Sequence, residues 1–390
     1  MTVEPFRVSI AAREIDDLKQ RLARTRWPDT LEGSGSALGA DLAWMRGLVE
    51  HWRTRFDWRA SEARINSYPH FRARVDGLWI HFIHQRGNGP APMPLIITHG
   101  WPGSFLEMLE ILPLLADPGR HGGDPADAFH VVVPSLPGYG FSDRPAEAGC
   151  NTFRIAGLWV GLMEGLGYGR FGAQGGDWGA SVTTLLGLLH PDRTTGIHLN
   201  YIPGSYRPWT GAGSTPLTEA EARFVRDAES WYETEGGYAH VQKTRPQTLA
   251  FGLNDSPAGL AAWILEKFRD WSDCGGNLES RFDRDDLLTH VSLYWFTQTI
   301  HSSCRLYLEA ARRPLHFGQG ERIAAPCGVA RFPMEAPSPP REWVERVYDV
   351  RRWTEMPRGG HFAAMEEPES LAKEIREFFR PLRSSSKEPA

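Results

Sequence analysis

Cysteine is scarce in this sequence, and none of it is arranged as a metal site. The four cysteines, Cys150, Cys274, Cys304 and Cys327, show neither a C-x-x-C spacing nor a metal-like pairing with histidine. We therefore expect free thiols in a reducing compartment and no metal bound through cysteine.

Long apolar runs and clusters of positive charge are also missing. No stretch approaches the ~18 consecutive apolar residues that a membrane span needs, and the N-terminal residues carry acidic side chains early, without the apolar core of a signal peptide. The formal net charge is only -5, and lysine and arginine are scattered along the chain, so nothing resembles a nucleic-acid footprint. We expect a soluble, cytoplasmic protein without a membrane anchor or a nucleic-acid partner.

What is present is a globular composition with many aromatic residues. Apolar residues make up 41% and charged residues 23% of the chain, close to the averages for soluble domains. At 390 residues the chain exceeds one compact core, so we expect a core with an appended element. The 15 Trp and 19 Phe serve packing first, and some of them can also line an apolar substrate pocket.

The first part of the chain has a helical pattern. Residues 15–26 and 38–55 place apolar side chains at helical intervals, which predicts an N-terminal helical extension over residues 1–68. Residues 71–83 then alternate as two strands joined by an Asp-Gly turn, the pattern of a β-hairpin.

Short apolar runs follow in alternation with helical patterns. The runs at 94–98 and 129–133 have the composition of strands buried on both faces of a parallel sheet. The repeated β-α order predicts an α/β fold with a doubly wound, mostly parallel sheet. Residues 201–315 show helical segments broken by glycine and proline, where we expect a helical lid. The core is therefore expected over residues 69–200 and 316–390.

The strongest chemical signal is the sequence GGDWG at 175–179, between a predicted strand and a predicted helix. It has the small-x-nucleophile-x-small spacing of the nucleophile elbow of α/β-hydrolases, a sharp turn that leaves no room for side chains at the glycines. Asp177 holds the nucleophile position, which predicts attack on a carbon centre and an alkyl-ester intermediate instead of serine-esterase chemistry. The alternative is that Asp177 only caps the helix, but the flanking glycines and the preceding strand favour the nucleophile.

A second signal, HGWPG at 99–103, follows the strand at 94–98. An α/β-hydrolase supplies one oxyanion-hole donor at this point. We predict that the backbone N–H groups of Trp101 and Trp178 form that hole, and that Trp101, Pro102 and Trp178 contact the substrate. An ordinary Gly-Pro loop is the alternative, which the elbow downstream makes less plausible.

The third signal is His361, in the sequence GGHF near the C-terminus. A nucleophile followed last by a histidine is the chain order of this fold. His361 would take a proton from water, with its ring oriented by a carboxylate on the other nitrogen.

Four acidic residues precede this histidine and could supply the carboxylate. We choose Glu335, because it lies in a loop after the predicted strand at 327–332, where this fold places its acid. Spacing alone leaves three others open: Glu342, Asp349 and Glu355.

Together these motifs resemble the microsomal-type epoxide hydrolase family, which includes insect juvenile hormone epoxide hydrolases and bacterial relatives. The resemblance covers nearly the whole chain and implies an α/β-hydrolase fold with an N-terminal meander and a helical lid. It also raises Glu335 above Asp349. The similar segments are FRV to WPD (6–29), HGWPG (99–103), GGDWG (175–179), FPME (332–335) and RGGHFAAMEEPE (358–369).

Two further segments, 235–242 and 302–307, resemble the two tyrosine motifs of that family. The resemblance implies that Tyr238 and Tyr307 are paired phenols that hold the epoxide oxygen. Such donors suit the reaction, because the oxygen becomes an alkoxide on ring opening and is a poor leaving group without a hydrogen bond or a proton. Spacing alone leaves three competing tyrosines: Tyr206, Tyr232 and Tyr294.

The enzyme implied is an ether-bond hydrolase that converts an apolar epoxide, such as a bulky aromatic or natural-product epoxide, and water into a vicinal diol. An ester at Asp177 would be hydrolysed by water that His361 and Glu335 activate. No metal or organic cofactor is implied, because every step uses a side chain, a backbone amide or water.

Two rival functions share the pattern. A haloalkane dehalogenase has the same fold and Asp-Trp pair, but it holds a halide with Trp or Asn donors. A catalytically silent ligand-binding relative is a second rival, against which the retained Asp, His and acid count. The sequence leaves open the substrate, the regiochemistry and enantioselectivity, the oligomeric state, monomer or homodimer, and a role in detoxification or in secondary metabolism.

Overall fold

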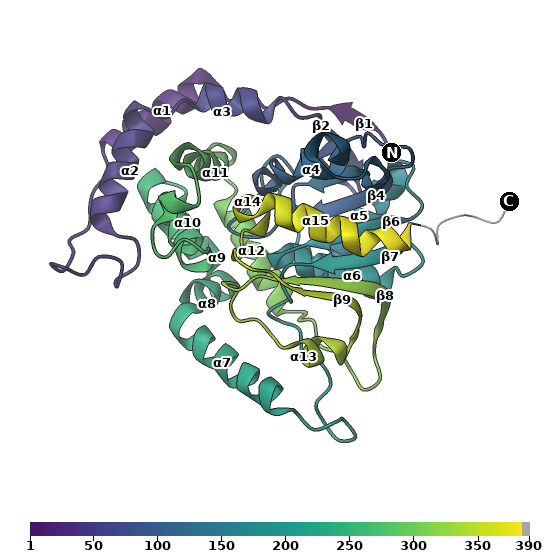
Figure 1. The fold of residues 1–390 in the computed structure, drawn as a ribbon. Helices are drawn as coiled ribbons and strands as arrows, with labels where there is room; N and C mark the ends of the chain where they lie inside the picture. The colour runs from purple at the N-terminus through teal and green to yellow at the C-terminus, as the bar shows by residue number, and fades with distance from the viewer. Residues whose placement is uncertain (384–390) are drawn as a thin grey trace.

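A computed structural model describes residues 1–383, and within these residues nine strands form one sheet with helices on both faces (Figure 1). The last residues of the predicted second part of the core, 384–390, lie outside the described residues. The strand order is β1-β2-β3-β5-β4-β6-β7-β8-β9. The strands are β1 (Val3–Pro5), β2 (His70–Val75), β3 (Leu78–Gln85), β4 (Met93–Thr98), β5 (Phe129–Pro134), β6 (Phe171–Gly175), β7 (Thr194–Leu199), β8 (Ile323–Arg331) and β9 (Tyr348–Glu355).

The sheet is antiparallel at one end and parallel through the rest. The pairs from β1 to β3, and the pair of β3 with β5, are antiparallel. All later pairs, from β5 to β9, are parallel. The inner strands β4 to β7 are almost fully buried, as expected for a parallel sheet covered on both faces. The predicted α/β-hydrolase fold class is thus confirmed.

Helices cover both faces of the parallel part. Ile197 of β7 lies against Gly187 of α6, whereas its neighbour Gly196 lies against Phe378 of α15. Because successive residues of a strand point to opposite faces, α6 and α15 cover opposite sides of the sheet. α5 packs with α6, and α4 packs with α15. These helices are α4 (Ile111–Ala116), α5 (Thr152–Gly165), α6 (Asp177–Leu189), α13 (Arg341–Glu345), α14 (Ala363–Glu366) and α15 (Pro368–Phe379).

A helical insertion separates β7 from β8 and packs on the loops that follow β4 and β5. Tyr294 donates its hydroxyl hydrogen bond to the Gly103 carbonyl (2.7 Å), and Ser302 donates to the Gly138 carbonyl (2.5 Å). The insertion therefore sits at the carboxyl ends of the parallel strands. Its helices are α7 (Glu219–Glu235), α8 (Gly237–Thr244), α9 (Pro246–Leu253), α10 (Pro257–Trp271), α11 (Arg284–Thr297) and α12 (Ile300–Ala311).

The N-terminal helices run along the outer side of this insertion (Figure 1). They are α1 (Ala12–Ala23), α2 (Leu42–Thr54) and α3 (Trp58–Ile65). The predicted helix at 38–55 was wrong at its start, because the Asp41 side chain accepts a hydrogen bond from Trp44 N and begins the helix at residue 42. The predicted end of the first helix, residue 26, is also too late. Neither α3 nor the short edge strand β1 was predicted. None of the helices within residues 1–383 is long and apolar enough to cross a membrane.

Candidate active site

The predicted chemical motifs meet at one edge of the sheet. The segment 99–103 follows β4, the segment 175–179 follows β6, and Glu335 and His361 lie in the loops after β8 and β9. These strands are parallel, so their carboxyl ends share an edge, which is where open α/β sheets place their ligand sites.

Asp177 occupies a strained turn between β6 and α6. Its φ of 48° is in the left-handed region that favours glycine. A Cβ on Gly175 would lie 2.3 Å from the Gly179 carbonyl oxygen, and one on Gly179 would lie 1.8 Å from the Thr98 oxygen. Only glycine fits at either position, and the turn exposes the Asp177 carboxylate at the end of the strand.

The loop after β4 holds one oxygen of this carboxylate. The Trp101 amide donates to Asp177 Oδ1 at 2.7 Å, and Gly100 lets that oxygen approach, since a Cβ there would be 2.1 Å from it. Pro102, which follows, is buried. The second predicted donor, the Trp178 amide, has no acceptor among residues 1–383, and it belongs to the first turn of α6, where such groups are free to bind an anion.

His361 bridges the two predicted carboxylates. Its Nε2 lies 3.5 Å from Asp177 Oδ2, and its Nδ1 lies 2.9 Å from Glu335 Oε2. The bond to Glu335 leaves Nε2 directed at Asp177. Burial by itself would lower the pKa of His361, but the charges of Glu335 and Asp177 raise this pKa well above its ordinary value.

The other three candidate acids have partners elsewhere. Of the four carboxylates that spacing left open, the structure brings only Glu335 to the histidine, and Glu335 is itself buried. The partners of the rest are Thr218 for Glu342, Arg351 for Asp349 and Arg331 for Glu355.

The loop that carries His361 is tied to the insertion by its backbone. The His361 amide donates to the Trp271 carbonyl at 2.8 Å. Gly360 makes this approach possible, because a Cβ there would lie 2.5 Å from the same carbonyl oxygen. The histidine is therefore held by the end of α10 as well as by its own strand β9.

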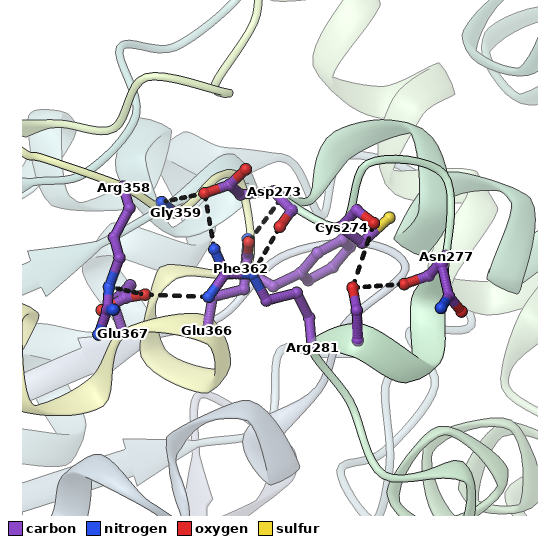
Figure 2. Close-up of polar contacts among 10 residues, drawn as sticks. Asp273, Cys274, Asn277, Arg281, Arg358, Gly359, Phe362, Glu366 and Glu367 are labelled. Atoms are coloured by element: carbon purple, nitrogen blue, oxygen red, sulfur yellow. Dashed lines mark hydrogen bonds and ion pairs between the residues drawn. The ribbon is translucent and has the colours of Figure 1, made fainter.

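Side chains strengthen the same connection (Figure 2). Asp273 Oδ2 accepts from the Gly359 amide at 3.0 Å and from Arg281 at 2.8 Å. Glu366 accepts from the amides of Asp273 (2.7 Å) and Phe362 (3.0 Å), and burial raises the pKa of Glu366 to about 7. We call these five residues the histidine clamp. Sequence reasoning missed it, since its two halves lie 86 residues apart between Asp273 and Gly359.

The two predicted phenols lie together, beside the two tryptophans that flank Asp177 in the site. Tyr238 lies on α8 and Tyr307 on α12, with ring centroids 5.9 Å apart. Trp101 stacks on Tyr238 at 5.5 Å, and Trp178 contacts Tyr307 edge-on at 4.7 Å. Burial raises the pKa of both phenols well above the ordinary value, so both remain protonated and able to donate at neutral pH.

The competing tyrosines form hydrogen bonds outside this pair. Each of the three donates its hydroxyl to a backbone carbonyl. The acceptors are Trp343 for Tyr206 (2.9 Å), Gly204 for Tyr232 (3.5 Å) and Gly103 for Tyr294 (2.7 Å).

Three residues near the catalytic triad of Asp177, His361 and Glu335 were not identified from the sequence. Trp271 and Tyr201 contact the His361 ring, with centroids 5.0 and 5.7 Å away. Glu107 lines the same small cavity as Asp177 and His361. A signal for Glu107 was available, since it is an acidic residue inside the apolar run FLEML, where an exposed side chain is not expected.

Comparison with known proteins points to one family. Residues 3–108 match the family model "Epoxide hydrolase N terminus", and residues 93–230 match "alpha/beta hydrolase fold". Epoxide hydrolase 1 of Oryctolagus cuniculus is 40% identical over 402 residues, covering 97% of this chain and 88% of that protein. The juvenile hormone epoxide hydrolase structure from Bombyx mori has 30% identity and a TM-score of 0.82, covering 98% and 94% of the two chains. The Aspergillus niger epoxide hydrolase structure has 32% identity and a TM-score of 0.84, covering 98% and 97%.

Proposed function

Because the chain belongs to the epoxide hydrolase family, we propose that it opens an apolar epoxide with Asp177 and releases a vicinal diol by hydrolysis of the resulting ester. The observation that carries this mechanism is the position of Trp101. Its amide holds the Asp177 carboxylate, while its ring packs against both Tyr238 and Tyr307. One residue thus joins the nucleophile to the two phenols, leaving the oxirane between them.

In the first step Oδ2 of Asp177 attacks a ring carbon, because Oδ1 is already held by the Trp101 amide. The ring carbon–oxygen bond breaks as the new ester bond forms. Tyr238 and Tyr307 donate hydrogen bonds to the departing oxygen, and one of the two phenols transfers its proton to that oxygen, which becomes the first hydroxyl of the diol. The phenol then regains a proton from solvent water. Oδ1 becomes the carbonyl oxygen of the ester and already faces an oxyanion donor.

In the second step His361 accepts a proton from water, and the water oxygen bonds to the carbonyl carbon of the Asp177 ester. Glu335 stabilises the imidazolium that forms, through its bond to Nδ1. The amides of Trp101 and Trp178 stabilise the charge that develops on Oδ1. Collapse of the intermediate breaks the ester bond, and the departing oxygen takes the proton from His361. Asp177 is left as a carboxylic acid, which then loses its proton.

The surroundings of the phenols favour an apolar substrate. Aromatic side chains pack against the two phenols. The ring of Trp271, for example, lies 5.1 Å from that of Tyr238 by ring centroids. We propose that residues 201–315 act as a lid that brings both phenols over the core formed by residues 69–200 and 316–390, and that residues 1–68 support this lid from outside. Aromatic walls offer large apolar area with few alternative polar contacts.

The ester intermediate provides the test. In the His361→Gln variant the first step should proceed while the second slows by roughly a thousandfold or more, in the range that loss of a triad member costs. Intact-protein mass spectrometry after mixing with styrene-oxide-like and aliphatic epoxides should show an adduct that peptide mapping assigns to Asp177. Wild-type protein should release diols. An adduct on a different carboxylate would show that the nucleophile assignment is wrong.

Two buried indole N–H groups in the site are a reason to measure dehalogenase activity as well. The indole N–H groups of Trp101 and Trp178 are buried and have no partner among residues 1–383, and indole donors can hold a halide. The phenol pair favours the epoxide, so we expect diol formation from epoxides and no halide release from matched haloalkanes. Halide release at a comparable rate would reverse that preference.

A further inference from the structure

A small cavity lies beside the nucleophile on the side of His361. It has about 20 Å³ of space for the centre of a water molecule, and a polar cavity above roughly 10–15 Å³ in this measure can hold one water. Its lining combines the catalytic groups with further polar side chains. The polar residues of the lining are His99, Gln174, Asp177, Asn200, His361 and Glu107.

Glu107 is the acidic residue of this lining that the two-step mechanism does not use. The residue is 8% exposed, and no side chain within residues 1–383 forms a hydrogen bond or ion pair with its carboxyl group. A buried carboxyl group without such a partner is costly, and a structural role would normally provide one. Its presence needs another explanation.

The chain makes room for this carboxyl group at a specific place. A Cβ on Gly103 would lie 1.4 Å from Glu107 Oε1 and 2.4 Å from Glu107 Cδ. Glycine at 103 thus allows the carboxyl group to fold back onto the same loop whose Trp101 amide holds Asp177. The single turn at 105–108 and the missing side chain at 103 place the acid in the cavity that Asp177 also lines.

We propose that Glu107 positions the hydrolytic water between His361 Nε2 and the carbonyl carbon of the Asp177 ester. This inference rests on the ester mechanism proposed above. A buried water needs two to four polar partners, and His361 alone would fix its distance but not its direction. The Glu107 carboxyl group supplies the second partner, so that a water lone pair points at the ester carbon while a water proton points at Nε2.

Glu107 does not change the number of protons that are transferred during ester hydrolysis. The water proton moves to His361 Nε2 as the water oxygen bonds to the ester carbon. The bond from that carbon to the alkyl oxygen then breaks, and the proton on His361 passes to that oxygen. The carboxyl group left at Asp177 loses its own proton, which balances the one taken up on ring opening. Glu107 begins and ends the step in the same protonation state.

The electrostatics agree with a group that binds water without adding charge. Burial is the main cause that raises the pKa of Glu107 to about 8. The charge of His361 lowers this pKa, and the charge of Asp177 raises it. A neutral carboxylic acid can donate one hydrogen bond and accept others. It therefore holds a water molecule next to Asp177 without placing another carboxylate charge beside the nucleophile.

Two substitutions separate positioning from structure. Glu107→Leu removes all hydrogen bonding at similar volume, and Glu107→Gln keeps a donor and an acceptor. In single-turnover experiments we expect the leucine variant to slow ester hydrolysis by about ten- to a hundredfold, within the range of a positioned polar group, and to change alkylation by less than about twofold. The ester should accumulate in it, and the glutamine variant should recover hydrolysis to within a few fold. Glu110→Gln, three residues later and exposed, is the matched control and should leave both steps unchanged.

Several results would overturn this assignment. Hydrolysis at the wild-type rate in Glu107→Leu, equal slowing of both steps, or a glutamine variant as slow as the leucine variant would each do so. If the leucine variant does not fold, Glu107→Ala with added formate replaces it, and formate should restore hydrolysis but not alter alkylation; absence of rescue would count against the proposal. If no variant, including His361→Gln, forms an adduct on Asp177, the ester mechanism itself fails.

Discussion

The two halves of the catalytic machinery are held in place by different means. Asp177 is fixed by backbone packing within two short segments, 98–101 and 175–179, through glycines that allow contacts of the main chain. His361 is fixed by the histidine clamp and by the end of α10, which come from distant parts of the chain. The nucleophile therefore depends on main-chain contacts between two segments of the core, and the base depends on hydrogen bonds to the helical insertion.

This difference predicts how each side fails. A main-chain contact at van der Waals distance cannot absorb an added methyl group, so changes on the nucleophile side should have large effects. A network of several hydrogen bonds can lose one member and keep the rest, so changes on the histidine side should be graded. Four predictions, from the largest expected effect to the smallest, test this contrast.

The largest effect should come from Asp177→Ala, which removes the attacking carboxylate. We expect no detectable diol formation and no covalent adduct, while the fold is kept because the Asp177 side chain is not part of the core. Diol assay, intact mass and circular dichroism measure the three outcomes. Residual turnover above background would mean that another group opens the ring.

The next largest effect concerns the phenols carried by the insertion. Each of Tyr238→Phe and Tyr307→Phe should slow alkylation by roughly ten- to a thousandfold, as loss of one positioned donor does, and should leave ester hydrolysis nearly unchanged. The double variant should lose far more than either single one, because no phenol then remains to donate. Stopped-flow tryptophan fluorescence can follow alkylation, given Trp101 and Trp178 beside the site. Alkylation at the wild-type rate in the double variant would make these tyrosines packing residues.

A smaller effect should separate the two sides directly. Asp273→Asn weakens two hydrogen bonds, the charge-assisted bond from Arg281 and the bond from the Gly359 amide. The loss should be on the order of 1 kcal/mol. We expect ester hydrolysis to slow by about three- to tenfold and alkylation to stay the same. Asp270→Asn, which removes the carboxylate that pairs with its neighbour Arg269, is the control. Equal slowing of both steps would show that the clamp supports the whole site and not the histidine alone.

The smallest expected effect is a change in the pKa of His361. Asp177 and Glu335 both raise the pKa of His361, and ester formation removes the Asp177 charge. Loss of one nearby negative charge destabilises the imidazolium, so the His361 pKa should be lower in Asp177→Asn, a neutral mimic of the ester, than in the wild type. The base is then more often deprotonated when hydrolysis needs it. NMR titration of the His361 ring measures both values, and an unchanged or higher pKa in the variant would contradict this account.

The same contrast explains what could be predicted from the sequence. The nucleophile elbow could be recognised in the sequence because its requirements lie within one short segment: a nucleophile between small residues, directly after a buried strand. The fold class followed from the β-α alternation, and the choice of Glu335 over Asp349 needed a family resemblance in addition to spacing. The support of His361 could not be predicted, since hydrogen bonds between Asp273, Gly359 and Glu366 leave no periodic trace in the sequence.

The outer position of the N-terminal helices limits how a substrate can enter. Trp52 on α2 donates to Ser292 on α11 at 3.0 Å, and Ser61 on α3 is 2.8 Å from Thr289 of the same helix by their hydroxyl oxygens. A hinged opening of the insertion would have to break these bonds together with the histidine clamp, which would also displace the base. We therefore expect substrate and diol to pass through local side-chain rearrangements and not through a hinged opening of the insertion. In hydrogen-exchange experiments α11 should be protected as strongly as the central strands, with exchange concentrated in the connecting loops of the insertion.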